Sequence, residues 1–113
     1  MNYPDAEFYF SEVTNALSAA FPSYSTEVLL KSASSLKMNV HLDPTTFIAI
    51  RYNARNGRTD FALIRNGERV FGYDNLKEWH CHPAADPIRH IPCNRPTIKE
   101  IIAEIRIVFN RPL

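Results

Sequence analysis

Residues 73–90 hold most of the side chains in this sequence that can move a proton or bind a phosphate. An acidic residue, Asp74, ends a run of β-forming residues, and three of the four histidines follow it, namely His80, His82 and His90. Imidazole titrates near neutral pH and can give or take a proton, and a carboxylate can orient it. The segment therefore predicts general acid–base chemistry, with Asp74, His80, His82 and His90 as candidate catalytic residues.

A metal ion is an alternative use of the same histidines. In an extended segment His80 and His82 point the same way, and His90 or Asp74 could complete a ligand set. The spacing lacks the repeated ligand pairs of zinc modules, so we expect no cofactor and keep a metal at His80 and His82 as the alternative. Histidines that only bond loop carbonyls are a further alternative. Cys81 would be a nucleophile only if a neighbouring imidazolium lowered its pKa.

Basic and aromatic residues near the histidines are suited to contacting RNA. Arg69 and Arg89 carry planar guanidinium groups, which can hold a phosphate through two hydrogen bonds. Trp79, the only tryptophan, would either stack on a base or anchor its segment to the core. With Tyr73, these residues are the candidate RNA or phosphate contacts. The net charge of +1 excludes a broadly basic surface and leaves a local patch open.

The bulk composition predicts one folded domain over residues 1–113. The chain is 45 % hydrophobic and contains only three glycines, which is typical of a globular protein. It has no signal-peptide pattern at its start and no apolar run near the roughly 20 residues that span a membrane. We therefore expect a cytoplasmic protein without a membrane partner, in which Cys81 and Cys93 stay reduced.

Four segments must position these side chains. Apolar spacing predicts a helix over residues 4–21, with a buried side made by Ala6, Phe10, Val13, Leu17 and Ala20. Alternating residues predict a β-meander over 27–74, with strands at 27–31, 36–42, 47–52, 60–65 and 68–73. A loop rich in histidine and proline follows over 76–95, and a capping box at Thr97 and Glu100 opens a helix over 97–109. The expected fold is α+β, an antiparallel β-meander sheet with the N-terminal and C-terminal helices packed on one face.

Two Asn-Gly pairs set the expected strand register. Asn56-Gly57 and Asn66-Gly67 are typical of two-residue type I′ turns. The second turn would place Asp60 on the face opposite to Asp74. The expected partners across it are Arg65 with Glu68, Leu63 with Val70, and Asp60 with Tyr73.

The motifs of the second half resemble a known family. They are Gly72-Tyr73-Asp74-Asn75, the segment with His80, His82, Pro83 and His90, and the run from Pro96 to Ile102. Together they resemble the TumE toxin family of prokaryotic toxin–antitoxin pairs, over roughly residues 36–105. In that family an arginine usually precedes Tyr-Asp-Asn, where this sequence has Gly72, and the histidine run is more compact.

The resemblance implies a small cytoplasmic toxin, monomeric or homodimeric, that pairs with a DNA-binding antitoxin protein and cleaves RNA. It implies His82 and His90 as acid and base, Asp74 as the orienting group, and Arg69 or Arg89 as the phosphate clamp. Two other classes stay open at this point. One is a non-enzymatic α+β module that binds a partner protein through its histidine segment, and the other is a metal-dependent nuclease.

Overall fold

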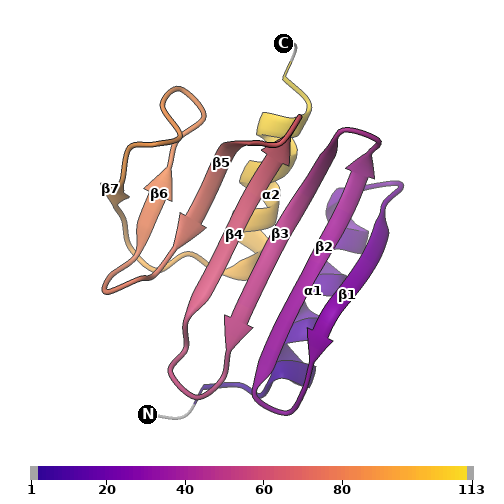
Figure 1. Cartoon of the computed structure of the whole chain (residues 1–113), viewed down its shortest axis with the longest axis vertical. Helices are drawn as coiled ribbons and strands as arrows, with labels where there is room; N and C mark the ends of the chain where they lie inside the picture. Colours follow the sequence, from indigo (N-terminus) through magenta and orange to yellow (C-terminus); the bar gives the residue numbers. More distant parts are fainter. Residues whose placement is uncertain (1–2, 112–113) are drawn as a thin grey trace.

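The computed structural model describes residues 3–111, which form an α+β fold in which one sheet carries two helices (Figure 1). The elements of this part of the chain are α1 (Ala6–Ala20), β1 (Ser25–Lys31), β2 (Ser35–Asp43), β3 (Thr46–Asn53), β4 (Thr59–Arg65), β5 (Glu68–Asp74), β6 (His80–His82), β7 (Ile91–Pro92) and α2 (Ile98–Phe109). The seven strands form a single sheet in chain order, and each pairs antiparallel with the next.

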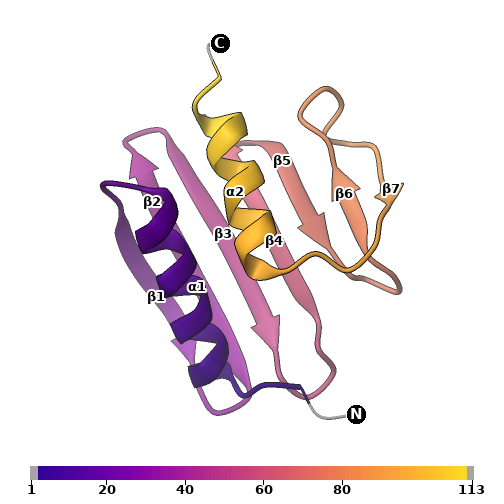
Figure 2. The same cartoon turned by 180° about the vertical axis from the view of Figure 1, so that it is seen from behind.

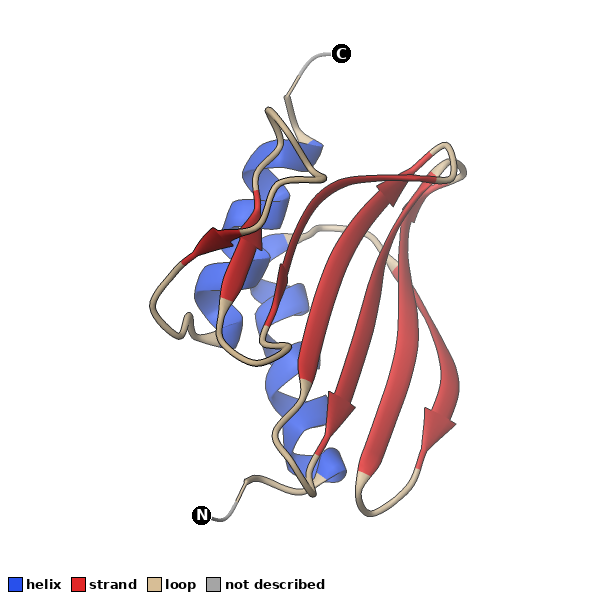
Figure 3. Ribbon diagram, turned by 60° about the vertical axis from the view of Figure 1, so that its left-hand side comes forward, coloured by secondary structure: helices blue, strands red, loops and turns tan. Residues whose placement is uncertain are grey.

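Both helices cover the same face of the sheet, as Figures 2 and 3 show. Their buried residues are Ala6, Tyr9, Val13 and Leu17 on α1 and Ile101, Ile102, Ile105 and Val108 on α2. The expected α+β meander with two helices on one face is confirmed. The buried side of α1 differs from the prediction, because Tyr9 is buried while Phe10 and Ala20 are only half-buried. The Tyr9 ring stacks on Tyr52 of β3 at 3.8 Å between centroids, which rotates the helix toward Tyr9.

Polar side chains fix the start of each helix. The Asp5 carboxylate accepts a hydrogen bond from the Phe8 amide at 2.8 Å. At α2 the Thr97 hydroxyl accepts from the Glu100 amide at 3.1 Å, and the Glu100 carboxylate accepts from the Thr97 amide at 2.9 Å. These bonds satisfy amides that have no partner within the helix. The predicted capping box is confirmed.

Part of the expected loop is sheet. Residues 76–95 contain β6 and β7, which continue the sheet beyond β5. The outer edge of β5 offers unpaired backbone groups, and β6 takes them up. Pro92, which has no amide hydrogen, lies in the outermost strand, where no further partner is needed. The prediction of an irregular segment is therefore wrong for 80–82 and 91–92, and two of the histidines lie on a strand.

The two Asn-Gly turns differ from each other. Asn66 and Gly67 have φ of 53° and 79°, as a two-residue type I′ turn requires. The first turn is longer than predicted, because β3 ends at Asn53 and β4 begins at Thr59. Side-chain oxygens explain the extra length: Asn53 Oδ1 accepts from the Arg55 amide at 2.8 Å and Asn56 Oδ1 from the Arg58 amide at 2.9 Å.

A β-bulge in β5 shifts the register between β4 and β5. Arg65 faces Glu68 as expected, but Leu63 faces Phe71 and not Val70, so Val70 is the extra residue. Asp60 then pairs with Asp74, and the expected pairing of Asp60 with Tyr73 is wrong. The bulge also turns Arg69 and Asp74 to the same face. Residues five apart on a regular strand would point to opposite faces.

Candidate functional site

The predicted acid and two histidines meet on the face of the sheet that the helices leave uncovered, here called the open face. His80 pairs with Asp74 and His82 pairs with Gly72 across β5 and β6, so all four share this face. His82 Nε2 lies 2.6 Å from Asp74 Oδ2. The prediction that Asp74, His80 and His82 lie close together is confirmed.

His82 is a buried group with both ring nitrogens engaged. The residue is 1 % exposed and Asp74 is 8 % exposed. Nε2 faces the Asp74 carboxylate, and Nδ1 lies 3.0 Å from the carbonyl oxygen of Pro87. A carboxylate can only accept, so Nε2 donates to Asp74, while Nδ1 lies between an acceptor, the Pro87 carbonyl oxygen, and a donor, Arg69 Nη1 at 3.4 Å. His82 therefore has no nitrogen free for a substrate, and its role is to position its neighbours.

The surroundings of Asp74 favour its charged form. Burial by itself would raise the pKa of this carboxyl group. The hydrogen bond from His82, a second one from the Leu76 amide at 3.1 Å, and the nearby histidines outweigh that effect and lower the pKa below its usual value. Asp74 is thus a fixed negative charge at the base of the site.

His90 and His80 are the histidines that face solvent more. The His90 ring packs edge-on against His82 at 4.4 Å between centroids, and against His80 at 5.6 Å. His90 is exposed and His80 is half-buried. Within residues 3–111, His80 Nδ1 is buried without a hydrogen-bond partner, and its Nε2 lies 3.7 Å from Glu78 Oε1. These two imidazoles can exchange protons with a molecule on the open face.

A cation and a second acid complete the cluster. Arg69 Nη1 lies 3.4 Å from His82 Nδ1, which places the guanidinium beside the histidines. Asp60 of β4 faces Asp74 of β5. Arg58 Nη2 lies 4.0 Å from Asp60 Oδ2. Burial raises the pKa of Asp60, an effect that Arg69 opposes and Asp74 reinforces. The sequence did not single out Asp60, because the expected register placed it on the other face.

Tyr73 and Cys81 point away from this site. They pair with each other across β5 and β6 on the helix-covered face, and the Tyr73 hydroxyl donates to Glu104 Oε1 at 2.7 Å. Tyr73 is 7 % exposed, which argues against the predicted RNA contact. Burial, followed by the charge of Glu104, raises the pKa of Cys81, which argues against a thiolate nucleophile. Cys81 and Cys93 are free thiols, as predicted.

Asn75, Trp79 and Arg89 occupy three different settings. Asn75 holds the β3–β4 turn, because it accepts from the Thr59 amide at 2.7 Å and donates to the Gly57 carbonyl at 2.8 Å. Trp79 packs partly against the core on the helix side. Arg89 is exposed between β6 and β7. Of the predicted phosphate-binding arginines, the structure brings Arg69 to the histidine cluster.

A group that could hold a metal ion also exists here. One donor atom each from Asp74, His82 and His90 lie within 4.8 Å of one another. The predicted pair of His80 and His82 is replaced by this trio, because His90 and not His80 approaches the His82–Asp74 bond. Oxygen and imidazole donors of this kind suit a divalent transition metal.

The fold and the site define an α+β meander protein with a histidine–aspartate cluster at one sheet edge. Comparisons with family models, with curated proteins and with solved structures gave no match for this chain. Among residues 3–111, no helix is long and apolar enough to cross a membrane.

Proposed function

We propose that this chain is an RNA-cleaving toxin of the TumE type that works by histidine acid–base chemistry. The observation that supports the proposal most is the buried His82–Asp74 bond of 2.6 Å, with the exposed His90 packed against it. A buried histidine–carboxylate hydrogen bond behind an exposed imidazole is an arrangement that holds a catalytic ring in one orientation. Arg69 adds a cation next to the same group.

The chemistry needs two proton carriers and one phosphate contact. A base removes the proton of a ribose 2′-hydroxyl, and the 2′-oxygen attacks the adjacent phosphorus. An acid protonates the departing 5′-oxygen, which leaves a 2′,3′-cyclic phosphate and a 5′-hydroxyl. His90 and His80, whose ring centroids lie 5.6 Å apart, are the two proton carriers. Arg69 stabilises the charge on the phosphate. His82 and Asp74 position His90, so the acid–base role first assigned to His82 passes to His80.

A toxin in the cytoplasm needs a partner that blocks it. We propose that a DNA-binding antitoxin protein covers the histidine cluster on the open face. The solvent-facing parts of this cluster are His90, Arg69 and the half-buried His80. A protein that covers these residues would exclude RNA from the same place.

Purified protein and a labelled RNA test the proposal directly. The wild type should give products with a 2′,3′-cyclic phosphate, and His90→Ala should lower the rate by about 10²- to 10⁴-fold. The matched control is His41→Ala, since His41 lies on β2 and pairs with Glu27 at 3.0 Å, outside the cluster. The same variants should rank alike in a growth assay. A His90→Ala protein as active as His41→Ala would refute the proposal.

A metal-dependent nuclease is the second candidate, because Asp74, His82 and His90 are grouped within 4.8 Å. A tetrahedral metal with bonds of about 2.0–2.1 Å keeps neighbouring donor atoms about 3.3 Å apart. Asp74 and His82 are closer, at 2.6 Å, and the His82 nitrogen carries a proton. A metal would have to displace that proton and separate the pair. Cleavage that is lost in EDTA and restored by zinc or manganese would favour this candidate over the first.

A further inference from the structure

A cavity on the helix-covered face lies on the other side of the sheet edge from the histidine cluster. It has a volume of about 280 Å³ and lies where the first turns of α1 and α2 meet the segment around Trp79. Trp79 directly precedes His80, so their side chains point to opposite faces of the sheet. The cavity is therefore separate from the site on the open face.

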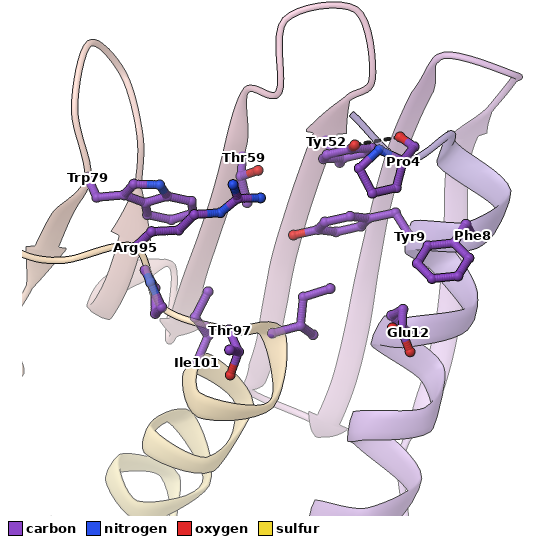
Figure 4. Close-up of a pocket in the computed structure, with 12 residues that line it drawn as sticks. Pro4, Phe8, Tyr9, Glu12, Tyr52, Thr59, Trp79, Arg95, Thr97 and Ile101 are labelled. Carbon is purple, nitrogen blue, oxygen red and sulfur yellow. Dashed lines mark hydrogen bonds between the residues drawn. The ribbon is translucent and has the colours of Figure 1, made fainter. Parts of the chain in front are cut away.

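Aromatic rings and one cation form the walls of this cavity (Figure 4). Trp79 and Arg95 lie on one side, and Tyr9 and Tyr52 lie on the opposite side. The two tyrosine rings are stacked with an interplanar angle of 7°, which makes that wall rigid. The Tyr52 hydroxyl donates to the Pro4 carbonyl at 2.5 Å and is fixed by that bond.

The guanidinium of Arg95 is available to an anion. None of the ion pairs found within residues 3–111 includes Arg95, and its side chain belongs to an exposed residue. Arg95 lines the cavity on the side opposite to Tyr9 and Tyr52. Across from it, Glu12 on α1 provides an acceptor for hydroxyl or amino hydrogens.

We propose that this cavity binds a nucleotide, with the base against Trp79 and the phosphate on Arg95. An indole ring is a stacking surface for any base, because every base has a π-face. A guanidinium can hold a phosphate through two parallel hydrogen bonds. The glutamate carboxylate of Glu12 suits the ribose hydroxyls or an exocyclic amine. The binding needs no RNA cleavage, so it stands or falls independently of the ribonuclease proposal.

The single tryptophan provides the measurement. Trp79 fluorescence is followed while adenosine, guanosine, cytidine or uridine 5′-monophosphate is added, with correction for absorption by the nucleotide. At least one of the four should give a saturable change. The nucleoside of the best-binding nucleotide and inorganic phosphate alone should each bind more weakly than that nucleotide, because each lacks one of the two contacts.

Two variants assign the contacts. Arg95→Gln should raise the dissociation constant on the order of 10- to 100-fold, and Arg55→Gln, at an exposed turn outside the cavity, should leave it unchanged. For the two tryptophan variants, calorimetry replaces fluorescence. Trp79→Ala should lose roughly 5- to 150-fold in nucleotide affinity, and Trp79→Phe should lose less affinity than Trp79→Ala. Circular dichroism establishes that each variant is folded. No saturable signal with any nucleotide, or equal affinity in Arg95→Gln and Arg55→Gln, would overturn the proposal.

Discussion

The hydrogen bond between His82 and the Asp74 carboxylate should stabilise the fold as well as build the site, and Asp74→Asn removes the negative charge of the acceptor. Asparagine keeps the size of the side chain and an oxygen that can accept from His82 Nε2, but its NH2 group then replaces the oxygen that accepts from the Leu76 amide. A hydrogen bond to a charged group contributes about 1.5–3 kcal/mol, and a neutral one contributes about 1 kcal/mol. Both side chains are almost fully buried, at 2 % and 12 % exposure, so water does not replace the lost charge. We expect a loss of about 1–2 kcal/mol in the free energy of unfolding at pH 7.

The stability difference between the wild type and Asp74→Asn depends on pH because the pKa of Asp74 is lowered in the folded chain. A carboxyl group whose pKa is lower in the folded chain than in the unfolded one stabilises the fold above the unfolded pKa, near 3.9 for aspartate. This contribution is lost as the pH falls through the folded pKa. The asparagine variant does not titrate. The difference in stability between wild type and Asp74→Asn should therefore be largest near neutral pH and should shrink below about pH 4.

Asp60→Asn is the matched control, because the pKa of Asp60 is shifted in the direction opposite to that of Asp74. Asp60 faces Asp74 on the same face, but burial raises its pKa. Its ionisation therefore opposes folding as the pH rises above the unfolded pKa. The variant loses only the 4.0 Å contact with Arg58, which contributes at most about 1 kcal/mol at a partly exposed position. Asp60→Asn should be close to the wild type at pH 7, or more stable.

Urea unfolding of the three proteins between pH 3 and pH 7 measures these differences. The slope of the unfolding free energy against urea concentration should be the same for each protein. In thermal unfolding, the loss at Asp74 should lower the midpoint by about 4–8 °C per kcal/mol. If Asp74→Asn matched the wild type at every pH, the charged hydrogen bond between His82 and Asp74 would not have the stabilising role given to it. The same conclusion would follow if Asp60→Asn cost as much as Asp74→Asn.

Four further substitutions test the packing and capping of α2 and the contact between β4 and β5. Ile105→Ala, at a fully buried position of α2, should cost about 2–5 kcal/mol, whereas Ile107→Ala, at a residue that is 52 % exposed, should cost under 1 kcal/mol in the same urea assay. Thr97→Ala removes the capping hydroxyl and should cost about 1 kcal/mol, seen as a lower thermal midpoint with unchanged helix content at 25 °C. Gly72→Ala would place a Cβ 2.7 Å from the Phe61 carbonyl oxygen. The variant should therefore lose about 1–3 kcal/mol in the free energy of unfolding. A variant as stable as the wild type would mean that β4 and β5 can separate.

Local signals in the sequence were enough to predict both helices and the first five strands. The apolar spacing of α2, its capping box and the Asn66-Gly67 turn are all encoded within a few neighbouring residues. β6 and β7 were missed because they span three residues and two residues, too short for any alternation to show. Their pairing is a tertiary effect, since the free edge of β5 supplies the partner.

The composition of the site was predictable and its geometry was not. Residue type and proximity in sequence pointed to Asp74, His82 and His90, which the structure brings together. Whether a histidine is buried or exposed decides its role, and that depends on how the segment after β6 folds back, with the Pro87 carbonyl reaching His82. Asp60 was missed because Val70 fits the alternating pattern of a regular strand, so nothing local marked the bulge.

Because Val70 is an extra residue in β5, deletion of its codon would disrupt the site in a way that no substitution reproduces. Arg69 and Asp74 share a face only because one additional residue lies between them in β5. Loss of that single codon would turn the arginine and the aspartate to opposite sides of the sheet, while every side chain of the site was still encoded. In an alignment of descendants the event would show as a gap at an unremarkable valine. An in-frame deletion at this codon is accordingly a way to take the site apart without replacing any residue assigned a chemical role.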